Sequence, residues 1–395
     1  MKPIDNAIAV MADELTAWRR HLHENPELGY EEFETQKFVA GKLREFGMDV
    51  VHEGMGGTGV VAMLHGADGP ATGPEGRIML RSDMDALPMD ELTGLPHASK
   101  NAGKMHACGH DGHMTMLLGA AKHLADKRNF SGSVVFCFQP AEEGGAGAKK
   151  MIEDGIFEQF DVRAVYGMHS LPGAAIGEIA AVPGPVMAAA DEFYITVTGK
   201  GGHAAVPDEA RDPIPAAALM VSAFQSIVSR VVDPLKPAVL SITIFQAGTT
   251  HNVIPETVTL GGTVRSFDTG VHEQIYAEIE KVIAGIAAAT GMKAELDRVD
   301  ICYPPTINDA TETKFVQDVL CEVVGHENVI TNAPPTMGAE DFAYFSQAKP
   351  GAFVFIGNGA SEPLHHPAYD FDDAAAPIGV AYWTKLVETA LKRKG

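Results

Sequence analysis

The chain has 395 residues, of which 46% are hydrophobic and 21% are charged. This length exceeds what one ordinary hydrophobic core accommodates, so we expect two domains, and the composition is that of a globular protein. The formal net charge of -22, from 52 acidic and 30 basic residues, repels phosphate groups and argues against binding to nucleic acid or to anionic membranes. Neither a transmembrane run of about 20 apolar residues nor a secretory signal is recognisable, and the cysteines suggest no disulfide framework, so we expect a cytoplasmic protein.

The first and last parts of the chain alternate helices with short apolar strands. Residues 7–23 are expected to form an amphipathic helix, whose end, with His21 and His23, packs on the core. Residues 65–76 are rich in glycine, proline and alanine and predict a loop. The apolar runs do not alternate with polar residues, which is typical of strands buried on both faces of a mostly parallel sheet. These runs comprise residues 77–81, 133–139, 164–168 and 352–357.

A different pattern occupies the middle of the chain. Its elements follow the order strand, helix, strand, strand, helix, strand, which is the split βαβ arrangement of a small ferredoxin-like α+β domain. We therefore expect a main α/β domain, formed by residues 1–186 and 300–395, with an inserted domain of residues 187–299. The elements of the inserted domain are expected at residues 191–199, 214–232, 238–248, 257–267, 273–291 and 293–301.

Ionisable side chains follow the expected buried strands at the point where each strand ends. Because ligands of open α/β sheets bind at the carboxyl ends of the strands, we expect these side chains to meet at one edge of the sheet. A loop of residues 106–113, with histidines, a cysteine and an aspartate, lies between the first two strands. The side chains are Asp83 and Asp85 after the first strand, Glu142 and Glu143 after the second, His169 after the third, and His365 and His366 after the fourth.

These residue types indicate a metal site. Cysteine, histidine and glutamate are ligands of Zn²⁺ and of its first-row neighbours. Cys108 and His110, two positions apart, can place both donor atoms on one loop that faces a single ion. Of the adjacent Glu142 and Glu143, one can bind the metal while the other takes a proton from water that the metal has activated. Asp85 is a candidate for orienting a ligand through a hydrogen bond.

Motifs spread in order over nearly the whole chain resemble the amidohydrolase branch of the metallo-aminoacylase/carboxypeptidase family. Its members include hippurate hydrolases, N-acyl-amino-acid amidohydrolases and auxin-conjugate hydrolases. The resemblance implies metal-dependent hydrolysis of the amide bond of N-acyl amino acids or, as an alternative, a metallocarboxypeptidase or dipeptidase that acts on short peptides. The motifs are RRHLHENPELGYEE (19–32), GKMHACGHDGH (103–113), QPAEEG (139–144), GMH (167–169), GKGGHAAVP (199–207), NVIPE (252–256), GAEDFAYF (338–345) and LHHPAYDF (364–371).

The resemblance also implies a role for individual residues. It makes Glu142 the general base, and it assigns metal binding to Glu143 rather than Glu142 and to His365 rather than His366. One or two divalent ions (zinc, manganese, cobalt or nickel) would be bound in each subunit. The implied metal ligands are Cys108, His110, Glu143, His169 and His365.

The resemblance implies further that the inserted domain is a lid through which the chain forms a homodimer or homotetramer. In relatives, a lid histidine reaches the active site of the partner subunit and stabilises the oxyanion, and His203 matches that position. Asn252 and Arg265 match lid positions that relatives use around the substrate and its carboxylate. The wider family departs from this chain at two positions, because it has a metal-bridging aspartate in place of Cys108 and a histidine in place of Asp83.

Two other functions stay open on the sequence alone. Cys108 with His110 or His113 could supply the nucleophile and the base of a metal-free cysteine hydrolase, which would survive chelation. A catalytically silent binding protein on the same fold would hydrolyse no N-acyl amino acid.

Overall fold

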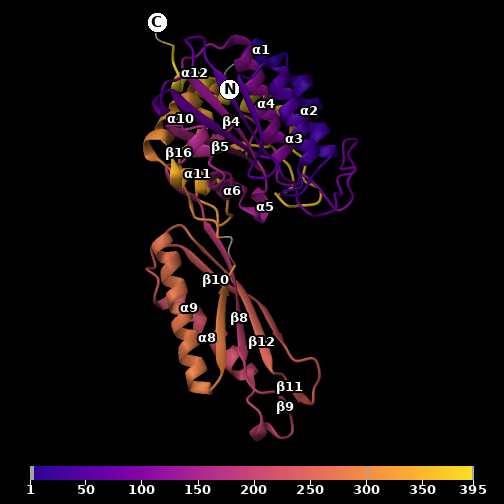
Figure 1. Cartoon of the computed structure of the whole chain (residues 1–395), viewed down its shortest axis with the longest axis vertical. Helices are drawn as coiled ribbons and strands as arrows, with labels where there is room; N and C mark the ends of the chain where they lie inside the picture. Colours follow the sequence, from indigo (N-terminus) through magenta and orange to yellow (C-terminus); the bar gives the residue numbers. More distant parts are fainter. Residues whose placement is uncertain (1–3, 300–301, 394–395) are drawn as a thin grey trace. The chain divides into compact units, whose positions relative to one another are not determined.

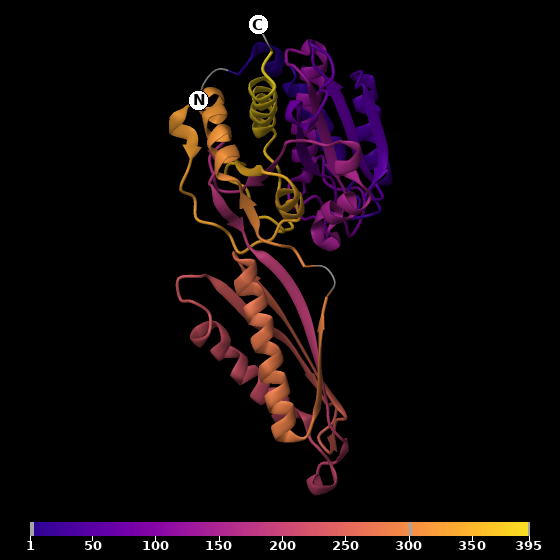
Figure 2. The ribbon, with the colours of Figure 1, turned by 60° about the vertical axis from the view of Figure 1, so that its left-hand side comes forward.

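The computed structural model describes residues 4–299 and 302–393 and divides into two compact units (Figures 1 and 2). The first unit consists of Met1–Gly184, Ile307–Pro334 and Asp341–Gly395, and the second of Pro185–Thr306 and Pro335–Glu340. Residues 335–340 were expected in the main domain, with the inserted domain bounded by residues 187 and 299, and these boundaries stay predictions. Of the strand expected at residues 293–301, the last two residues lie outside the described part.

The first unit is built on an eight-stranded sheet with the strand order β1-β2-β4-β3-β5-β16-β6-β15. The neighbouring strands β4, β3, β5 and β16 all run parallel to one another. Together with the flanking helices, this sheet confirms the expected α/β class. The strands are β1 (Val50–Met55), β2 (Gly59–His65), β3 (Arg77–Asp83), β4 (Ser133–Gln139), β5 (Ala164–Leu171), β6 (Ile179–Ala180), β15 (Val329–Ile330) and β16 (Gly351–Gly357).

Helices cover both faces of this sheet. Every residue of β4 is buried, and successive residues of a strand point to opposite faces. Phe136 belongs to the main hydrophobic core, whereas the Sγ atom of its neighbour Cys137 lies 3.8 Å from the sulfur of Met151 in α6. The helices of the first unit are α1 (Asn6–Ala9), α2 (Ala12–Glu24), α3 (Phe33–Glu45), α4 (His110–Lys127), α5 (Glu142–Gly145), α6 (Gly147–Glu153), α7 (Ile156–Gln159), α10 (Ala310–Val323), α11 (Phe342–Ala348) and α12 (Ala376–Ala390).

One predicted helix proves to be two. The helix expected at residues 7–23 is interrupted between α1 and α2, where the amide of Met11 bonds to the carbonyl oxygen of Ile8 at 3.0 Å in a tight turn. The turn buries Ile8 and Met11 while Val10 stays 80% exposed, so tertiary packing overrides the continuous helical pattern. No described helix has the length and apolar character of a membrane span.

The second unit has the predicted strand and helix order and the ferredoxin-like arrangement. Its antiparallel sheet has the strand order β10-β12-β8-β13, and the long helices α8 and α9 pack against each other and against this sheet (Figure 2). The elements are β8 (Ala189–Thr198), α8 (Pro213–Arg230), β10 (Ala238–Ala247), β12 (Thr257–Ser266), α9 (Thr269–Thr290) and β13 (Lys293–Arg298), with the short strands β9 (Gly202–His203) and β11 (Val253–Ile254) paired separately.

Candidate metal centre

The parallel strands bring distant parts of the chain to one edge of the sheet in the first unit. Asp83 is the last residue of β3, and His169 lies near the end of the adjacent β5. Glu142 and Glu143 begin α5, directly after β4, while α4 begins at His110. The loop after β16 returns to this edge, because the amide of His365 bonds to the carbonyl oxygen of Ala107 at 2.8 Å.

The structure brings together the side chains that the resemblance assigns as metal ligands. The donor atoms of Cys108, His110 and His169 lie within 4.8 Å of one another, and so do those of Cys108, Glu143 and His365. The Sγ atom of Cys108 is 3.3 Å from Nε2 of His169, and Oε1 of Glu143 is 3.3 Å from Nε2 of His365. His110, Glu142 and Glu143 form a third such group, so both glutamates lie at the cluster.

Two histidines turn Nε2 toward this cluster. Nδ1 of His169 donates to the carbonyl oxygen of Ser170 at 2.8 Å, and Nδ1 of His110 donates to that of Asp85 at 2.9 Å. A carbonyl oxygen can only accept, so the proton of each neutral ring stays on Nδ1 and leaves Nε2 available to a metal. Among the described residues, Nε2 of His110 is a buried atom that finds no hydrogen-bond partner, as expected of a ligand atom that faces a cation.

The electrostatics of the cluster favour a bound cation. Burial lowers the pKa of His169 to about 3, which keeps its ring neutral. Burial also disfavours charge on His110, but the carboxylates of Asp83, Asp85 and Glu143 outweigh it and raise the pKa to about 10. Burial and the nearby Glu143 raise the pKa of the Cys108 thiol well above its ordinary value, so a thiolate needs a compensating cation. This environment opposes a free Cys108 thiolate as a nucleophile.

Asp85 contacts two of the surrounding groups. Its Oδ2 atom accepts a hydrogen bond from the amide of Glu143 at 2.9 Å, and its carbonyl oxygen holds His110 as described. Asp85 is fully buried, so it can fix both partners in place. These contacts support the orienting role that the sequence analysis predicted for it.

The structure distinguishes the two adjacent histidines after β16. His365 faces Glu143, whereas Nδ1 of His366 lies 3.9 Å from Glu362 and accepts a hydrogen bond from the amide of Ala368. His365 has a positive φ of 64°, an unusual conformation for a residue with a side chain. The geometry therefore favours His365 as the ligand.

A buried network behind the cluster was missing from the sequence analysis. Asp83 accepts from Nη1 of Arg81 at 2.8 Å and from Nδ1 of His113 at 2.7 Å. Arg81 also pairs with Asp341 at 3.0 Å and donates to Gln139 at 2.7 Å. The arginine that directly follows the apolar residues 78–80 was the available signal, but its partner is 260 positions away. The network holds Asp83 as a carboxylate beside the cluster, because His110, His113 and Arg81 outweigh burial and keep its pKa well below the ordinary value.

The remaining predicted site residues belong to the second unit. His203 is exposed in β9, and the amide of Ala204 bonds to the carbonyl oxygen of Asn252 at 3.1 Å, so these two positions are neighbours. Arg265 lies in β12, opposite Val239 and Ala190, and is half-buried. Their roles toward a substrate stay predictions.

A second cluster of ligand types occurs within the second unit. The donor atoms of Asp191, His272 and Cys302 lie within 4.8 Å of one another. Oδ2 of Asp191 is 3.2 Å from Nη2 of Arg298, which stacks on the ring of Tyr276 at 3.8 Å. Because the guanidinium already balances the charge of this carboxylate, we interpret the cluster as an anchor for the start of α9 rather than a metal site.

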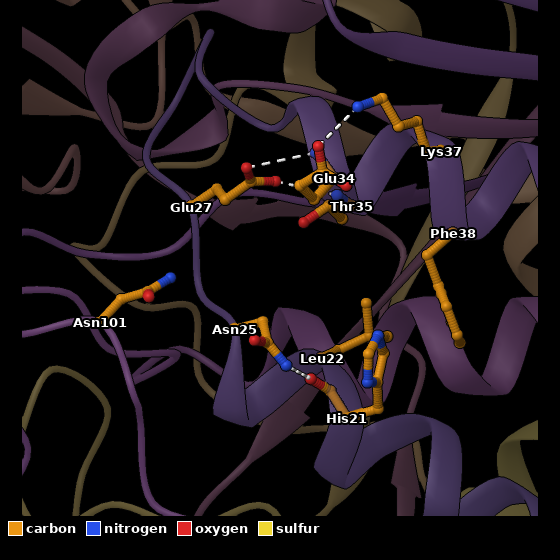
Figure 3. A pocket seen from close by; sticks show the side chains of 9 residues that line it. All are labelled: His21, Leu22, Asn25, Glu27, Glu34, Thr35, Lys37, Phe38 and Asn101. Carbon is orange, nitrogen blue, oxygen red and sulfur yellow. Dashed lines mark hydrogen bonds and ion pairs between the residues drawn. The ribbon is translucent and has the colours of Figure 1, made fainter.

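A separate cavity of about 510 Å³ lies beside α2 and α3, and none of the candidate ligands lines it (Figure 3). Its polar groups bond to one another: Lys37 pairs with Glu34 at 2.5 Å, and Asn25 donates to the carbonyl oxygen of His21 at 2.8 Å. His23 points elsewhere and lies fully buried, with Nδ1 2.7 Å from Asp111 next to the cluster. The cavity therefore presents no polar group that marks a ligand.

The sequence profile of Peptidase family M20/M25/M40 matches residues 79–389 of the chain. The chain belongs to this family. The resemblance noted from the motifs is therefore confirmed, and with it the assignment of the protein to the hydrolases.

Several known proteins are similar to the chain over most of their length. The hippurate hydrolase of Campylobacter jejuni is 43% identical, with 95% of this chain and 96% of the relative covered. The N-acetyl-L-cysteine deacetylase of Bacillus subtilis is 44% identical, with 93% and 86% covered. A crystal structure of a dinuclear metal-binding peptidase of the M20 family from Bacillus subtilis superimposes with a TM-score of 0.83 at 36% identity, covering 97% of this chain and 99% of that one.

Proposed function

We propose that this protein hydrolyses the amide bond of N-acyl amino acids and releases a carboxylic acid and a free amino acid. The observation that carries the proposal is the convergence of five candidate ligands of three residue types on one largely buried cluster in an M20-family chain. The activities named for the similar proteins from Campylobacter jejuni and Bacillus subtilis support this substrate class. The proposed ligands are Cys108, His110, Glu143, His169 and His365.

These ligands suit a divalent transition metal. The thiolate and imidazole donors favour zinc, cobalt or nickel, and the carboxylate also suits manganese, so one or two of these ions would be held per subunit. When bound, such an ion acts as a Lewis acid toward the scissile carbonyl and makes water a better nucleophile near neutral pH. The carbonyl partners of Nδ1 already direct Nε2 of His110 and of His169 at the cluster.

Glu142 is the proposed general base. It is 6% exposed and lies within the group formed with His110 and Glu143, so it can reach water at the cluster. In this role Glu142 takes a proton from the attacking water and returns it to the leaving amine. Asp85 keeps the neighbouring Glu143 in place through the hydrogen bond to its amide.

The second unit supplies the proposed contacts to the substrate. We propose that His203 stabilises the oxyanion in the active site of a partner subunit, and that Asn252 and Arg265 bind the substrate and its carboxylate. Among the described residues, the half-buried Arg265 has no ion-pair partner within 4.0 Å, which leaves its guanidinium available for a carboxylate. The edge strand β10 exposes Phe245, as expected if this unit forms the proposed homodimer or homotetramer. A cytoplasmic location is proposed from the composition.

A hydrolysis panel tests the proposal. Acetyl, benzoyl, long-chain acyl and indole-acetyl amino acids would be offered with zinc, manganese, cobalt or nickel in turn, beside dipeptides and short peptides. We expect release of a free amino acid from at least one N-acyl class, and loss of this activity on chelation with recovery on adding metal. Activity on peptides alone would favour the carboxypeptidase alternative, activity that survives chelation would favour the cysteine hydrolase, and no hydrolysis at all would overturn the proposal.

A further inference from the structure

The motif at residues 19–32 contains a segment that runs beside the turn carrying Glu142. We call residues 27–32 the strap. The strap forms a parallel bridge with the chain after β3, where the amide of Ala86 bonds to the carbonyl oxygen of Glu27 at 2.8 Å. A Cβ atom at Gly29 would lie only 3.0 Å from Ala141, and the hydroxyl of Tyr30 donates to the carbonyl oxygen of Gly145 at 2.7 Å. Gly29 and Tyr30 of the strap therefore lie against the turn after β4.

The last residue of the strap, Glu32, uses its carboxylate in an unusual way. Glu32 occupies the N-cap position of α3, but its side chain accepts no hydrogen bond from the first amides of this helix. Here Glu27 accepts from the amides of Glu34 at 3.2 Å and Thr35 at 2.8 Å instead (Figure 3). Because Glu27 caps α3, the Glu32 carboxylate is free to contact residues far away in the sequence.

One of those contacts is made to the turn that carries Glu142. Oε1 of Glu32 accepts a hydrogen bond from the amide of Ala141 at 2.8 Å, and Oε2 accepts from the hydroxyl of Thr58. Glu32 is fully buried, so solvent cannot replace either bond. The carbonyl oxygen of Ala141 is held on the other side by the amide of Gly147 at 3.1 Å.

Ala141 needs this support, because its backbone is strained. It has a φ of 50° and a ψ of 48°, a left-handed conformation that a residue with a Cβ atom rarely adopts. Ala141 immediately precedes Glu142, so a change of its backbone angles would swing both Glu142 and Glu143. The Glu32 bond thus acts at the point where the direction of these side chains is set.

We propose that Glu32 is a positioning residue that holds Ala141 in its left-handed conformation and thereby aims Glu142 at the reacting groups. The proposal rests on the function proposed above, and it assigns a task to a motif that the metal centre does not use. Burial, together with the charge of Asp85, raises the pKa of Glu32 to about 7 against the hydrogen bonds from Thr58 and Ala141. A glutamine, whose carbonyl oxygen can also accept from Ala141, is therefore a fair replacement.

The experiment compares Glu32→Ala and Glu32→Gln with a matched control. Asp309→Ala removes an acidic N-cap from α10, where the side chain accepts from the amides of Thr311 and Glu312 and has no contact with the turn. The measurements are kcat, KM, bound metal, thermal unfolding and hydrogen exchange of the Ala141 amide. The hydrogen-exchange measurement does not depend on enzymatic activity.

We expect Glu32→Ala to lower kcat by about 10- to 100-fold while KM and bound metal stay within about twofold, and to speed exchange of the Ala141 amide. Glu32→Gln should keep kcat within about threefold, and Asp309→Ala should lose stability alone. If Glu32→Ala does not fold, Glu32→Asp replaces it, because the shorter carboxylate can cap α3 but falls short of Ala141.

Two results would overturn the proposal: a kcat for Glu32→Ala no lower than that of the control, or an unchanged exchange rate at Ala141. A wild-type protein that hydrolyses no N-acyl amino acid would instead contradict the proposed function, and the exchange measurement would still test the link between Glu32 and Ala141.

Discussion

Two backbone carbonyl groups decide which ring nitrogen of each histidine faces the candidate metal centre. The oxygens of Ser170 and Asp85 accept from His169 and His110, which fixes the ring protons on the side away from the cluster. A side-chain partner could itself gain or lose a proton, whereas a backbone carbonyl oxygen only accepts hydrogen bonds. The two rings are therefore prepared as ligands by the fold itself.

The different roles proposed for the adjacent glutamates, general base and metal ligand, give the first prediction. Glu142→Ala should lower kcat by about 10² to 10⁴-fold with bound metal unchanged, because it removes a base and no ligand. Glu143→Ala is the matched control and should lose metal, since its carboxylate lies 3.3 Å from His365 within the ligand cluster. Steady-state kinetics and metal analysis check both, and loss of metal from Glu142→Ala would reverse the two roles.

The buried pair of His23 and Asp111 predicts a pH dependence of stability. Burial opposes charge on His23, but its bonds to Asp111 and Glu91 raise the pKa from 6.5 to about 9. The folded state thus binds the proton more tightly than the unfolded state, so the stabilisation is complete below pH 6.5 and is lost as the pH rises through 9.

The measurement is the free energy of unfolding of the wild type relative to His23→Asn, with a chelator present so that metal binding adds no pH dependence. The advantage of the wild type should shrink by a few kcal/mol between the two pH values. A difference that stays constant with pH would show that His23 does not carry this charge.

Among the secondary-structure elements, α6 depends on a glycine at its first residue. A Cβ atom at Gly147 would lie 1.7 Å from the carbonyl oxygen of Pro140, so α6 can approach the end of β4 only without a side chain there. Gly147→Ala should destabilise the protein by more than about 2 kcal/mol and also lower kcat, because the Ala141 turn must shift.

Gly41→Ala is the control for this prediction. Gly41 lies in α3 with no neighbouring atom within 4 Å of its Cβ position, and this substitution should stabilise the helix by up to about 1 kcal/mol. Chemical unfolding compares the two variants. Equal stabilities would mean that the packing of α6 on Pro140 is not required.

The sequence predicted the elements whose pattern is strong and local. The central strands are buried on both faces, so their apolar runs were recognisable, and their parallel arrangement implied a common edge for Glu142, Glu143 and His169. The strands β6 and β15 have two residues each, too short for a periodic pattern. The break after α1 escaped prediction because the helical pattern continues through Val10.

Contacts between residues far apart in the chain could not be predicted from patterns. The bonds from Arg81 to Asp341 and from Ala141 to Glu32 join buried polar groups, and each requires knowledge of the folded arrangement. The motifs nevertheless included Asp341 and Glu32, so the sequence marked their positions without indicating their partners.

At the scale of the whole molecule, the proposed oligomer gives a further prediction. If His203 acts in the active site of a partner subunit, His203→Ala should lower kcat by about 10² to 10³-fold while the metal content and the oligomeric state stay unchanged. Sedimentation of the wild type should show a dimer or a tetramer. A fully active protein that is monomeric at assay concentrations would remove His203 from the mechanism.

We propose that hydrolysis depends on the metal ion or ions bound by the largely buried cluster in the first unit. Anomalous scattering from crystals grown with zinc or cobalt tests it most directly. We expect a peak within coordination distance of Cys108, His110, Glu143 or His169, in protein that is active with the same metal. An active protein whose anomalous map has no peak among these side chains would contradict it.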